Sequence, residues 1–276
     1  DKYKKKTLRL GDLLHLDKPH IQSRLKTMLE YKNLELGGCY HQAPMSYPAL
    51  LSWCEKKAEQ FAPYITDTGN YIAAALSNHQ KVVLEAQLGA MRDIDYGIFP
   101  YTSSSSTISA YGPIGAGIPG TLPDHIVGVL KAYSTCVGAG PFTAEKAMPE
   151  KWMESLRKSG GEYGAATGRP RRVGPFDAVA SAYGLKCQNA DKIALTKLDV
   201  LSHMDEIPVI TSYKLNDEII TEFDPLDDLD SMTPVIQMLP GWNTDISKCR
   251  KYEELPENAR KYIETLEHLL NHEIQF

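Results

Sequence analysis

The sequence predicts an α/β protein with a helical section at its N-terminal end. This prediction rests on the period at which apolar residues recur. Up to residue 75 they recur at steps of three and four, which places them on one face of a helix. Beyond residue 80, short β-prone runs alternate with glycine-rich loops, and one amphipathic stretch closes the chain. We therefore expect a helical subdomain over residues 1–78 and an α/β region over residues 79–276.

The helical section contains two apolar stripes. The first follows Pro19 and the second follows Pro48, and proline suits the first turn of a helix. A short third helix is expected over residues 70–76. The stripes comprise Ile21, Leu25, Met28 and Leu29 in the first helix, and Leu51, Cys54, Ala58, Phe61 and Ile65 in the second.

The region after residue 79 mixes strand and helix patterns. The pair Asn216-Asp217 divides residues 209–223 into a hairpin, and residues 257–270 have the spacing of an amphipathic helix. That helix would bury Ala259, Tyr262, Ile263, Leu266 and Leu270 on one face. We also expect strands at residues 81–85, 193–195 and 235–238, and a helix at residues 125–133.

The composition is that of an ordinary soluble globular protein. Of the 276 residues, 42% are hydrophobic and 24% are charged, and the formal net charge is −5. This acidic balance provides no global field for nucleic acid or an anionic membrane, so neither is an expected partner. No apolar stretch approaches the roughly 18 residues that span a bilayer. Five cysteines without CxxC spacing argue against a zinc site or disulfide framework and favour a reducing, cytoplasmic location.

A run of hydroxyl side chains occupies residues 102–107, inside the glycine-, serine- and proline-rich residues 97–120. Large apolar residues interrupt that longer stretch more often than they would a flexible linker, so we expect an ordered functional loop. Small hydroxyl residues supply donors and let backbone N–H groups approach an anion, which predicts a phosphate site. A solvated serine-rich turn is the alternative.

A local cationic cluster follows at residues 164–172, where Arg169, Arg171 and Arg172 accompany two glycines. Arginine recognises carboxylate and phosphate through two parallel hydrogen bonds. In an acidic chain this cluster predicts a small-anion site, with a solvated loop as the alternative.

Residues 196–199, Thr-Lys-Leu-Asp, follow an apolar run at a strand end. They are similar to the [NT]KxD element of GTPases, in which the carboxylate accepts hydrogen bonds from guanine; many strand ends carry Lys and Asp, so this match alone is weak. Asp93 and Asp95 would suit metal binding or acid–base chemistry, although loop carboxylates more often cap backbone groups or pair with a basic residue. No P-loop, nucleophile elbow or zinc-type histidine spacing occurs.

Taken in order, these stretches resemble the adenylosuccinate synthetase family. DIDYGIFPYTSSS from Asp93 is similar to the family's DIDxGTYPYVTSSNTT-like segment, and KAYSTCVGAGPF from Lys131 is similar to KAYSTRVGAGPF. Residues 164–172 are similar to GATTGRRRR, residues 195–201 to LTKLDVL and residues 239–242 to MPGW. Lys2 and residues 8–13 also fit. Five ordered matches over nearly the whole chain make this resemblance highly specific.

The resemblance implies a GTPase-like ligase with a central mixed or parallel sheet, in which residues 79–276 bind nucleotide and substrates. The family joins IMP and L-aspartate, using GTP and Mg²⁺, as a homodimer in AMP biosynthesis. GTP phosphorylates the purine O6, and the aspartate amine then displaces that phosphate. By position, the resemblance assigns IMP binding to Lys5 (from the partner subunit), Gln87, Leu88, Ser103 and Arg169, aspartate binding to Thr167, Arg169 and Arg171, and GTP binding to Lys197, Asp199 and Arg171.

The chain also departs from the family pattern. The family's general base, its GDEGKG phosphate loop and its catalytic histidine are expected upstream of residue 1, and its STGP segment beyond Phe276. Lys5 replaces an arginine, and Leu88 takes the place of a glutamine that contacts IMP, with Gln87 one residue early. Three interpretations stay open: the greater part of a working synthetase, a phage-like paralogue that ligates aspartate to a guanine nucleotide, and a non-catalytic fragment that keeps the dimer surface.

Overall fold

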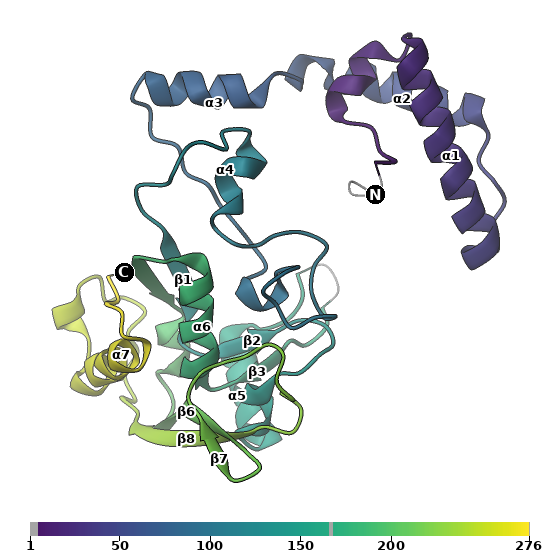
Figure 1. Ribbon diagram of the computed structural model, residues 1–276. Coiled ribbons are helices and arrows are strands. Elements are labelled where there is room, and N and C mark those ends of the chain that lie inside the picture. Colours follow the sequence, from purple (N-terminus) through teal and green to yellow (C-terminus); the bar gives the residue numbers. More distant parts are fainter. Residues whose placement is uncertain (1–4, 166–167, 276) are drawn as a thin grey trace. The chain divides into compact units, whose positions relative to one another are not determined.

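A computed structural model describes residues 5–165 and 168–275 of the chain (Figure 1). The chain forms two compact units, unit 1 over residues 1–82 and unit 2 over residues 83–276. In the described residues unit 1 contains only helices and turns, and every strand belongs to unit 2. Among these residues, each helix is too short or too polar to be a candidate membrane span.

Unit 1 contains the three helices that the apolar spacing predicts. They are α1 (Pro19–Tyr40), α2 (Tyr47–Phe61) and α3 (Thr68–Ser77), with short 3-10 helices η1 (Leu10–His15) and η2 (Ala62–Tyr64) beside them. Side-chain caps begin the later helices, because Ser46 accepts a hydrogen bond from the N–H of Ala49 and Asp67 accepts one from the N–H of Asn70.

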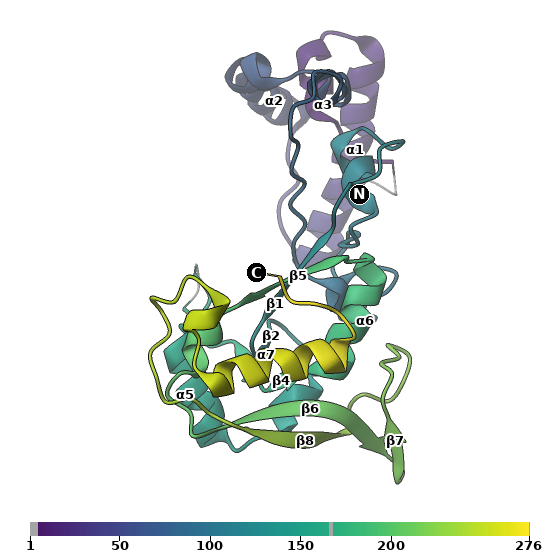
Figure 2. The ribbon, with the colours of Figure 1, turned by 90° about the vertical axis from the view of Figure 1, so that its left-hand side faces the viewer.

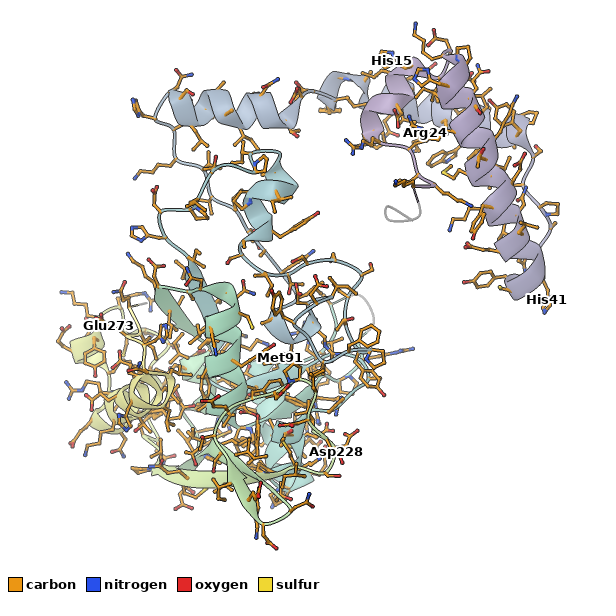
Figure 3. The ribbon with its side chains drawn as sticks, viewed as in Figure 1. His15, Arg24, His41, Met91, Asp228 and Glu273 are labelled. Atoms are coloured by element: carbon orange, nitrogen blue, oxygen red, sulfur yellow. The ribbon has the colours of Figure 1, made fainter. Side chains whose placement is uncertain are left out.

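The core of unit 1 is small. It consists of Leu16, Ile21, Leu25 and Cys54, and the ion pair between Arg24 and Asp12 at 2.9 Å joins α1 to η1; Figure 3 labels Arg24. The stripe predicted for α2 is longer than the helix. Ile65 lies beyond its end, because Pro63 has no N–H with which to continue the hydrogen-bond series of the helix.

Unit 2 consists of short strands with helices packed against them. Its helices are η3 (Ala90–Arg92), α4 (Tyr111–Ala116), η4 (Thr143–Lys146), α5 (Glu150–Gly160), α6 (Ala178–Gln188), η5 (Leu198–Leu201), η6 (Tyr252–Glu254) and α7 (Glu257–Leu270). Its strands are β1 (Val127–Lys131), β2 (Ser134–Cys136), β3 (Arg172–Gly174), β4 (Phe176–Asp177), β5 (Lys192–Thr196), β6 (Glu206–Leu215), β7 (Glu218–Ile220) and β8 (Thr233–Pro240).

The strands pair in both directions. β1 and β5 are parallel, β2 and β3 are antiparallel, and β6 pairs with β4 in parallel and with β7 and β8 in antiparallel orientation. The turn between β6 and β7 has positive φ at Asn216 (48°) and Asp217 (69°), as a tight hairpin requires. The predicted α/β class with mixed and parallel pairing is confirmed, as are the hairpin and the strands at residues 193–195 and 235–238.

Helix α7 lies along β6 and β8 and closes the core of unit 2 (Figure 2). Its bounds agree with the predicted helix, and the five residues expected on its apolar face are all buried. Tyr262 also donates a hydrogen bond from its hydroxyl to the carbonyl of Ala132 at 2.7 Å, so the buried phenol has a partner. This helix therefore holds the segment after β1 in place.

Two predicted elements are wrong. A helix is predicted over residues 125–133, but residues 127–131 form strand β1. Their β-prone run pairs with β5 in parallel register from Val127 with Lys192 to Lys131 with Thr196. Residues 81–85 form no strand with any described residue, and Val83 is 90% exposed. A β-prone run becomes a strand only where another strand supplies hydrogen bonds.

Glycine in β1 explains how closely the strand packs on helix α6. A Cβ added at Gly128 would lie 2.6 Å from Cδ2 of Leu185. The residue therefore marks a close approach between strand and helix rather than a helix interior.

Asp177 is a buried carboxylate at the start of α6. It accepts hydrogen bonds from the N–H of Ala180 at 3.0 Å and from the hydroxyl of Tyr213 at 2.6 Å. Burial disfavours the charged form and raises its pKa to about 6, against an ordinary value of 3.8. Since the folded state then binds more protons than the unfolded state, the stability that depends on this group falls as pH rises from about 4 to about 6.

We expect Asp177→Asn to remove this pH dependence while keeping an oxygen that caps α6. Each unit of pKa elevation corresponds to about 1.4 kcal/mol. The variant should therefore gain roughly 2–3 kcal/mol of unfolding free energy relative to the parent between pH 4 and pH 7. Urea denaturation of both proteins at four pH values measures this difference. Parallel pH profiles would contradict the assignment.

Candidate functional site

The carboxyl ends of β1 and β5 lie side by side. Lys131 ends β1 and stands opposite Thr196, which ends β5. Lys197 follows with a left-handed φ of 63°, and its ammonium donates to the carbonyl of Gly160 at 3.2 Å. Ligands of open α/β sheets bind at the carboxyl ends of parallel strands. The TKLD segment therefore occupies a position typical of a ligand site, next to the end of α5.

Glu162 is the centre of a buried charge network at this edge. Its carboxylate, 1% exposed, accepts hydrogen bonds from the ammonium of Lys131 at 2.8 Å and the hydroxyl of Tyr133 at 2.6 Å. Its second oxygen accepts from Arg171 at 2.8 Å. Burial by itself would raise the pKa of Glu162, but these donors outweigh it and the net pKa lies below the ordinary value. One carboxylate thus fixes two cations from different parts of the chain.

The same network makes Tyr133 a poor acid. Burial and then the hydrogen bond to Glu162 raise the pKa of the Tyr133 phenol well above its ordinary value of 10, and the charge of Asp199 adds to the effect. Tyr133 therefore stays a neutral donor to Glu162 at physiological pH.

Residues 164–172, the arginine loop, begin and end beside Glu162. The N–H of Arg171 donates to the carbonyl of Glu162, the N–H of Gly164 donates to the carbonyl of Arg169, and Tyr163 forms an isolated bridge with Pro170. Arg157 on α5 donates its Nε–H to the carbonyl of Arg171 at 2.9 Å. The side chain of Arg171 is still 34% exposed. The loop is therefore anchored at its base while a guanidinium face remains open to an anion.

A cavity of about 390 Å³ lies against the base of this loop. Three guanidinium groups and two carboxylates contribute to its wall. The lining residues are Glu145, Glu150, Met153, Arg157, Pro170, Arg171, Arg172 and Val173.

Residues 102–107, the hydroxyl run, are shaped by Asp93. This carboxylate is fully buried and accepts hydrogen bonds from the N–H groups of Asp95 and Tyr96 and from the N–H of Thr107 at 2.6 Å. The hydroxyl of Ser106 also donates to it at 3.1 Å. Burial opposes the charge of Asp93, but these donors keep its pKa below the ordinary value. The sequence left open metal binding, acid–base chemistry, pairing with a basic residue and backbone capping for Asp93. Its geometry supports backbone capping.

Ser103 lies in a tight turn within the hydroxyl run. Its N–H donates to the carbonyl of Arg92 at 2.8 Å, and its hydroxyl accepts from the N–H of Ser105 at 3.1 Å. The hydroxyl residues of the run range from exposed at Ser104 and Ser105 to buried at Thr107.

The predicted site residues lie in different parts of the chain, with Ser103 in the hydroxyl run. Arg171 pairs with Glu162, Lys197 donates to the carbonyl of Gly160 at the end of α5, and the charge of Asp199 acts on Tyr133. Gln87 and Leu88 lie in an exposed segment before η3, where Leu88 has a φ of 75°, and Arg169 is exposed. Lys5 belongs to unit 1, and Thr167 lies outside the described residues.

Sequence reasoning missed Glu162 and Lys131. An acid placed directly before an arginine cluster is one signal that could have identified Glu162. No local pattern marks Lys131 as the partner of Glu162, since the two residues are 31 positions apart in the sequence.

Comparison with known proteins gives a consistent result. A family model described as "Adenylosuccinate synthetase" matches residues 1–276. The adenylosuccinate synthetase of Carboxydothermus hydrogenoformans is 40% identical over 270 residues, which cover 98% of this chain and 62% of the relative. That of Thermomicrobium roseum is 36% identical over 271 residues, with the same coverage.

A solved structure has the same fold. The fully ligated adenylosuccinate synthetase from Plasmodium falciparum superposes with a TM-score of 0.87 and 32% identity, covering 99% of this chain and 64% of the other. The chain thus spans a little under two thirds of the length of these relatives. With motifs, fold and sequence identity in agreement over its whole length, the chain belongs to the adenylosuccinate synthetase family.

Proposed function

We propose that the protein containing this chain is a GTP-dependent ligase that joins IMP and L-aspartate to form adenylosuccinate. The observation that carries the proposal is the juxtaposition of Arg171, Lys131 and the TKLD segment at the carboxyl ends of β1 and β5. A guanidinium and an ammonium suit anionic substrates, and the carboxylate of Asp199 suits the N–H donors of a guanine base. All three groups lie near the carboxyl ends of β1 and β5. Membership of the family supports the same reaction.

The proposed mechanism has two steps. The terminal phosphoryl of GTP passes to O6 of IMP, and the amine of aspartate then attacks the purine C6 and displaces phosphate. Arg171 would hold an aspartate carboxylate and contribute to the GTP site, its guanidinium oriented in advance by Glu162. Lys197 and Asp199 would bind the guanine base. The remaining assignments are Ser103, Gln87, Leu88 and Arg169 for IMP, Lys5 for the IMP phosphate of the partner subunit, and Thr167 and Arg169 for aspartate.

The family reaction also uses Mg²⁺. Within residues 5–165 and 168–275, no three His, Cys, Asp or Glu side chains converge on a point that could hold a metal ion.

The test is turnover by the natural polypeptide that contains residues 1–276. With IMP, aspartate and GTP together we expect adenylosuccinate, and omission of any one substrate should abolish it. Product formation with GMP or dGMP in place of IMP would instead support the guanine-nucleotide paralogue. No product with either purine would reject the ligase proposal.

We further propose that residues 1–276 alone do not catalyse the formation of adenylosuccinate. The resemblance assigns the phosphate loop and the general base to sequence outside this range, and electrostatic stabilisation of the transferring phosphoryl group is the main catalytic contribution in such reactions. Adenylosuccinate formation by the isolated 276-residue chain would refute this point.

Arg171→Leu should chiefly raise the KM for aspartate. The substitution removes a charge-assisted hydrogen bond to a small dicarboxylate, and bonds of that kind contribute roughly 1.5–3 kcal/mol. We therefore expect the aspartate KM to rise about tenfold or more, with a smaller change in the KM for IMP. Steady-state kinetics with each substrate varied in turn measures both. An unchanged aspartate KM would remove Arg171 from the site.

We propose that the protein is a homodimer, with Lys5 of each subunit directed toward the other. In the sequence, Lys2, Lys5 and Arg9 form a basic group near the start of the chain, and Asp95 is a candidate acidic partner. Charge pairs of this kind fix register more than they add affinity. Light scattering at micromolar concentration should give the mass of a dimer, and a purely monomeric species would count against the proposal.

A further inference from the structure

Residues 136–140, the glycine loop, connect the two anion-binding stretches of unit 2. The loop leaves strand β2, whose partner β3 begins at Arg172. A Cβ added at Gly140 would lie 2.6 Å from Cγ of Tyr101, so the loop also packs against the residue before the hydroxyl run. Gly138 and Gly140 have φ values of 88° and 106°, a region that glycine enters freely. Such a loop needs outside contacts to hold one conformation.

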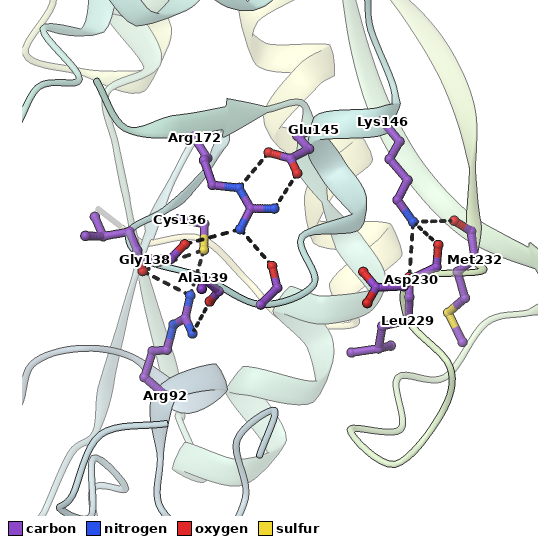
Figure 4. A network of polar contacts seen from close by, with 12 residues as sticks. Arg92, Cys136, Gly138, Ala139, Glu145, Lys146, Arg172, Leu229, Asp230 and Met232 are labelled. Carbon is purple, nitrogen blue, oxygen red and sulfur yellow. Dashed lines mark hydrogen bonds and ion pairs between the residues drawn. The ribbon is translucent and has the colours of Figure 1, made fainter. Parts of the chain in front are cut away.

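Arg92 holds the glycine loop from one side (Figure 4). Its guanidinium donates to the carbonyl of Ala139 at 3.1 Å, to the carbonyl of Val137 at 3.0 Å and to Sγ of Cys136 at 2.8 Å. The same group donates to the carbonyl of Tyr101. Through its own carbonyl, Arg92 accepts the N–H of Ser103. One residue thus binds both the glycine loop and the start of the hydroxyl run.

Arg172 holds the glycine loop from the other side. Its guanidinium donates to the carbonyl of Gly140 at 2.7 Å and to that of Gly138 at 3.3 Å, and Glu145 orients it through an ion pair. Arg172 is the last residue of the arginine loop and follows Arg171 directly. Hydrogen bonds therefore run without a break from the hydroxyl run, through Arg92 and the glycine loop, to the arginine loop.

We propose that Arg92 is a positioning residue that sets the hydroxyl run relative to the arginine loop. This inference rests on the proposed function, in which the hydroxyl run binds the phosphate of IMP. A planar guanidinium carries five N–H donors in a fixed fork, so Arg92 can donate to the glycine loop and to Tyr101 at once. Arg92 acts on substrate only through Ser103 and its neighbours, and it fixes the distance at which they meet a bound nucleotide.

The first test is amide hydrogen exchange in the protein that contains residues 1–276. In Arg92→Leu we expect exchange in residues 101–107 and 136–140 to accelerate about tenfold or more, which corresponds to loss of one charged hydrogen bond. Exchange in α7 should not change. Arg92→Lys should restore part of the protection, because an ammonium can donate to some of the same carbonyls. Arg250→Leu is the matched control, since Arg250 likewise donates to loop carbonyls, those of Ser247 and Cys249.

The second test is the division of the effect between substrates. If the inference holds, Arg92→Leu raises the KM for IMP about tenfold with little change in the KM for GTP, and Arg92→Lys lies between the variant and the parent. Unchanged exchange in both loops would overturn the inference, as would accelerated exchange with equal effects on both substrates. A parent protein that makes no adenylosuccinate would reject the proposed function instead, and the exchange experiment would still decide whether Arg92 links the two loops.

Discussion

Asp199→Asn is expected to lower kcat/KM for GTP by about 100-fold or more, the upper part of the range for a hydrogen bond to a charged group. A carboxylate accepts hydrogen bonds from both the N1–H and the exocyclic amine of guanine. The asparagine amide keeps the shape but turns one acceptor into a donor that faces the guanine amine. The KM values for IMP and aspartate should stay near those of the parent, because Asp199 contacts neither in the proposed arrangement.

Xanthosine triphosphate makes this prediction sharper. It carries a carbonyl where guanine has the amine, so it should restore part of the activity of Asp199→Asn. Asp191→Asn is a matched control, since Asp191 precedes the other end of β5 and pairs with His125. The guanine-binding role of TKLD is rejected if Asp199→Asn uses GTP with the kcat/KM of the parent. It is also rejected if the folded variant gains no activity with xanthosine triphosphate.

Glu162→Gln should destabilise the protein and weaken aspartate binding together. Removing one partner of a buried ion pair leaves the other charge uncompensated, at a cost of 3–5 kcal/mol where both groups are buried. Lys131 and Arg171 are 29% and 34% exposed, so solvent compensates in part and we expect about 2–3 kcal/mol in urea denaturation. The aspartate KM should rise as well, because Arg171 loses the group that orients it.

The pH dependence gives a second check on Glu162. Its pKa is lower in the folded state than the ordinary value of 4.5, so its contribution to stability is present above that value and is lost as pH falls through the folded pKa. The difference between parent and Glu162→Gln should therefore be largest near neutral pH and shrink in acid. Glu150→Gln is the control: Glu150 is 70% exposed beside Arg157, and such surface pairs contribute under about 1 kcal/mol. Equal effects of the two substitutions would show that Glu162 has no special role.

Local sequence rules predicted the elements whose neighbours along the chain decide their form. Residues 257–270 have a complete apolar face at helical spacing, and Asn216-Asp217 suits a tight turn, so α7 and the β6–β7 hairpin could be predicted. The motifs could also be located, since a hydroxyl run, an arginine cluster and a TKLD segment are visible in the amino-acid sequence. Composition and spacing identified these three stretches as separate candidate sites, but did not show which of them lie close together in the fold.

The tertiary structure decided what long-range partners control. Residues 127–131 became strand β1 because β5 pairs with them and Gly128 packs on α6, and residues 81–85 lack such a partner among the described residues. Glu162 joins Lys131 to Arg171, and Arg92 contacts Cys136, which lies 44 residues further along the chain. No local pattern relates these positions. Sequence periodicity records which face of a segment is apolar. The charge and hydrogen-bond partners of a buried group depend on which distant segments the fold brings within about 3 Å, and that information exists only once the chain is folded.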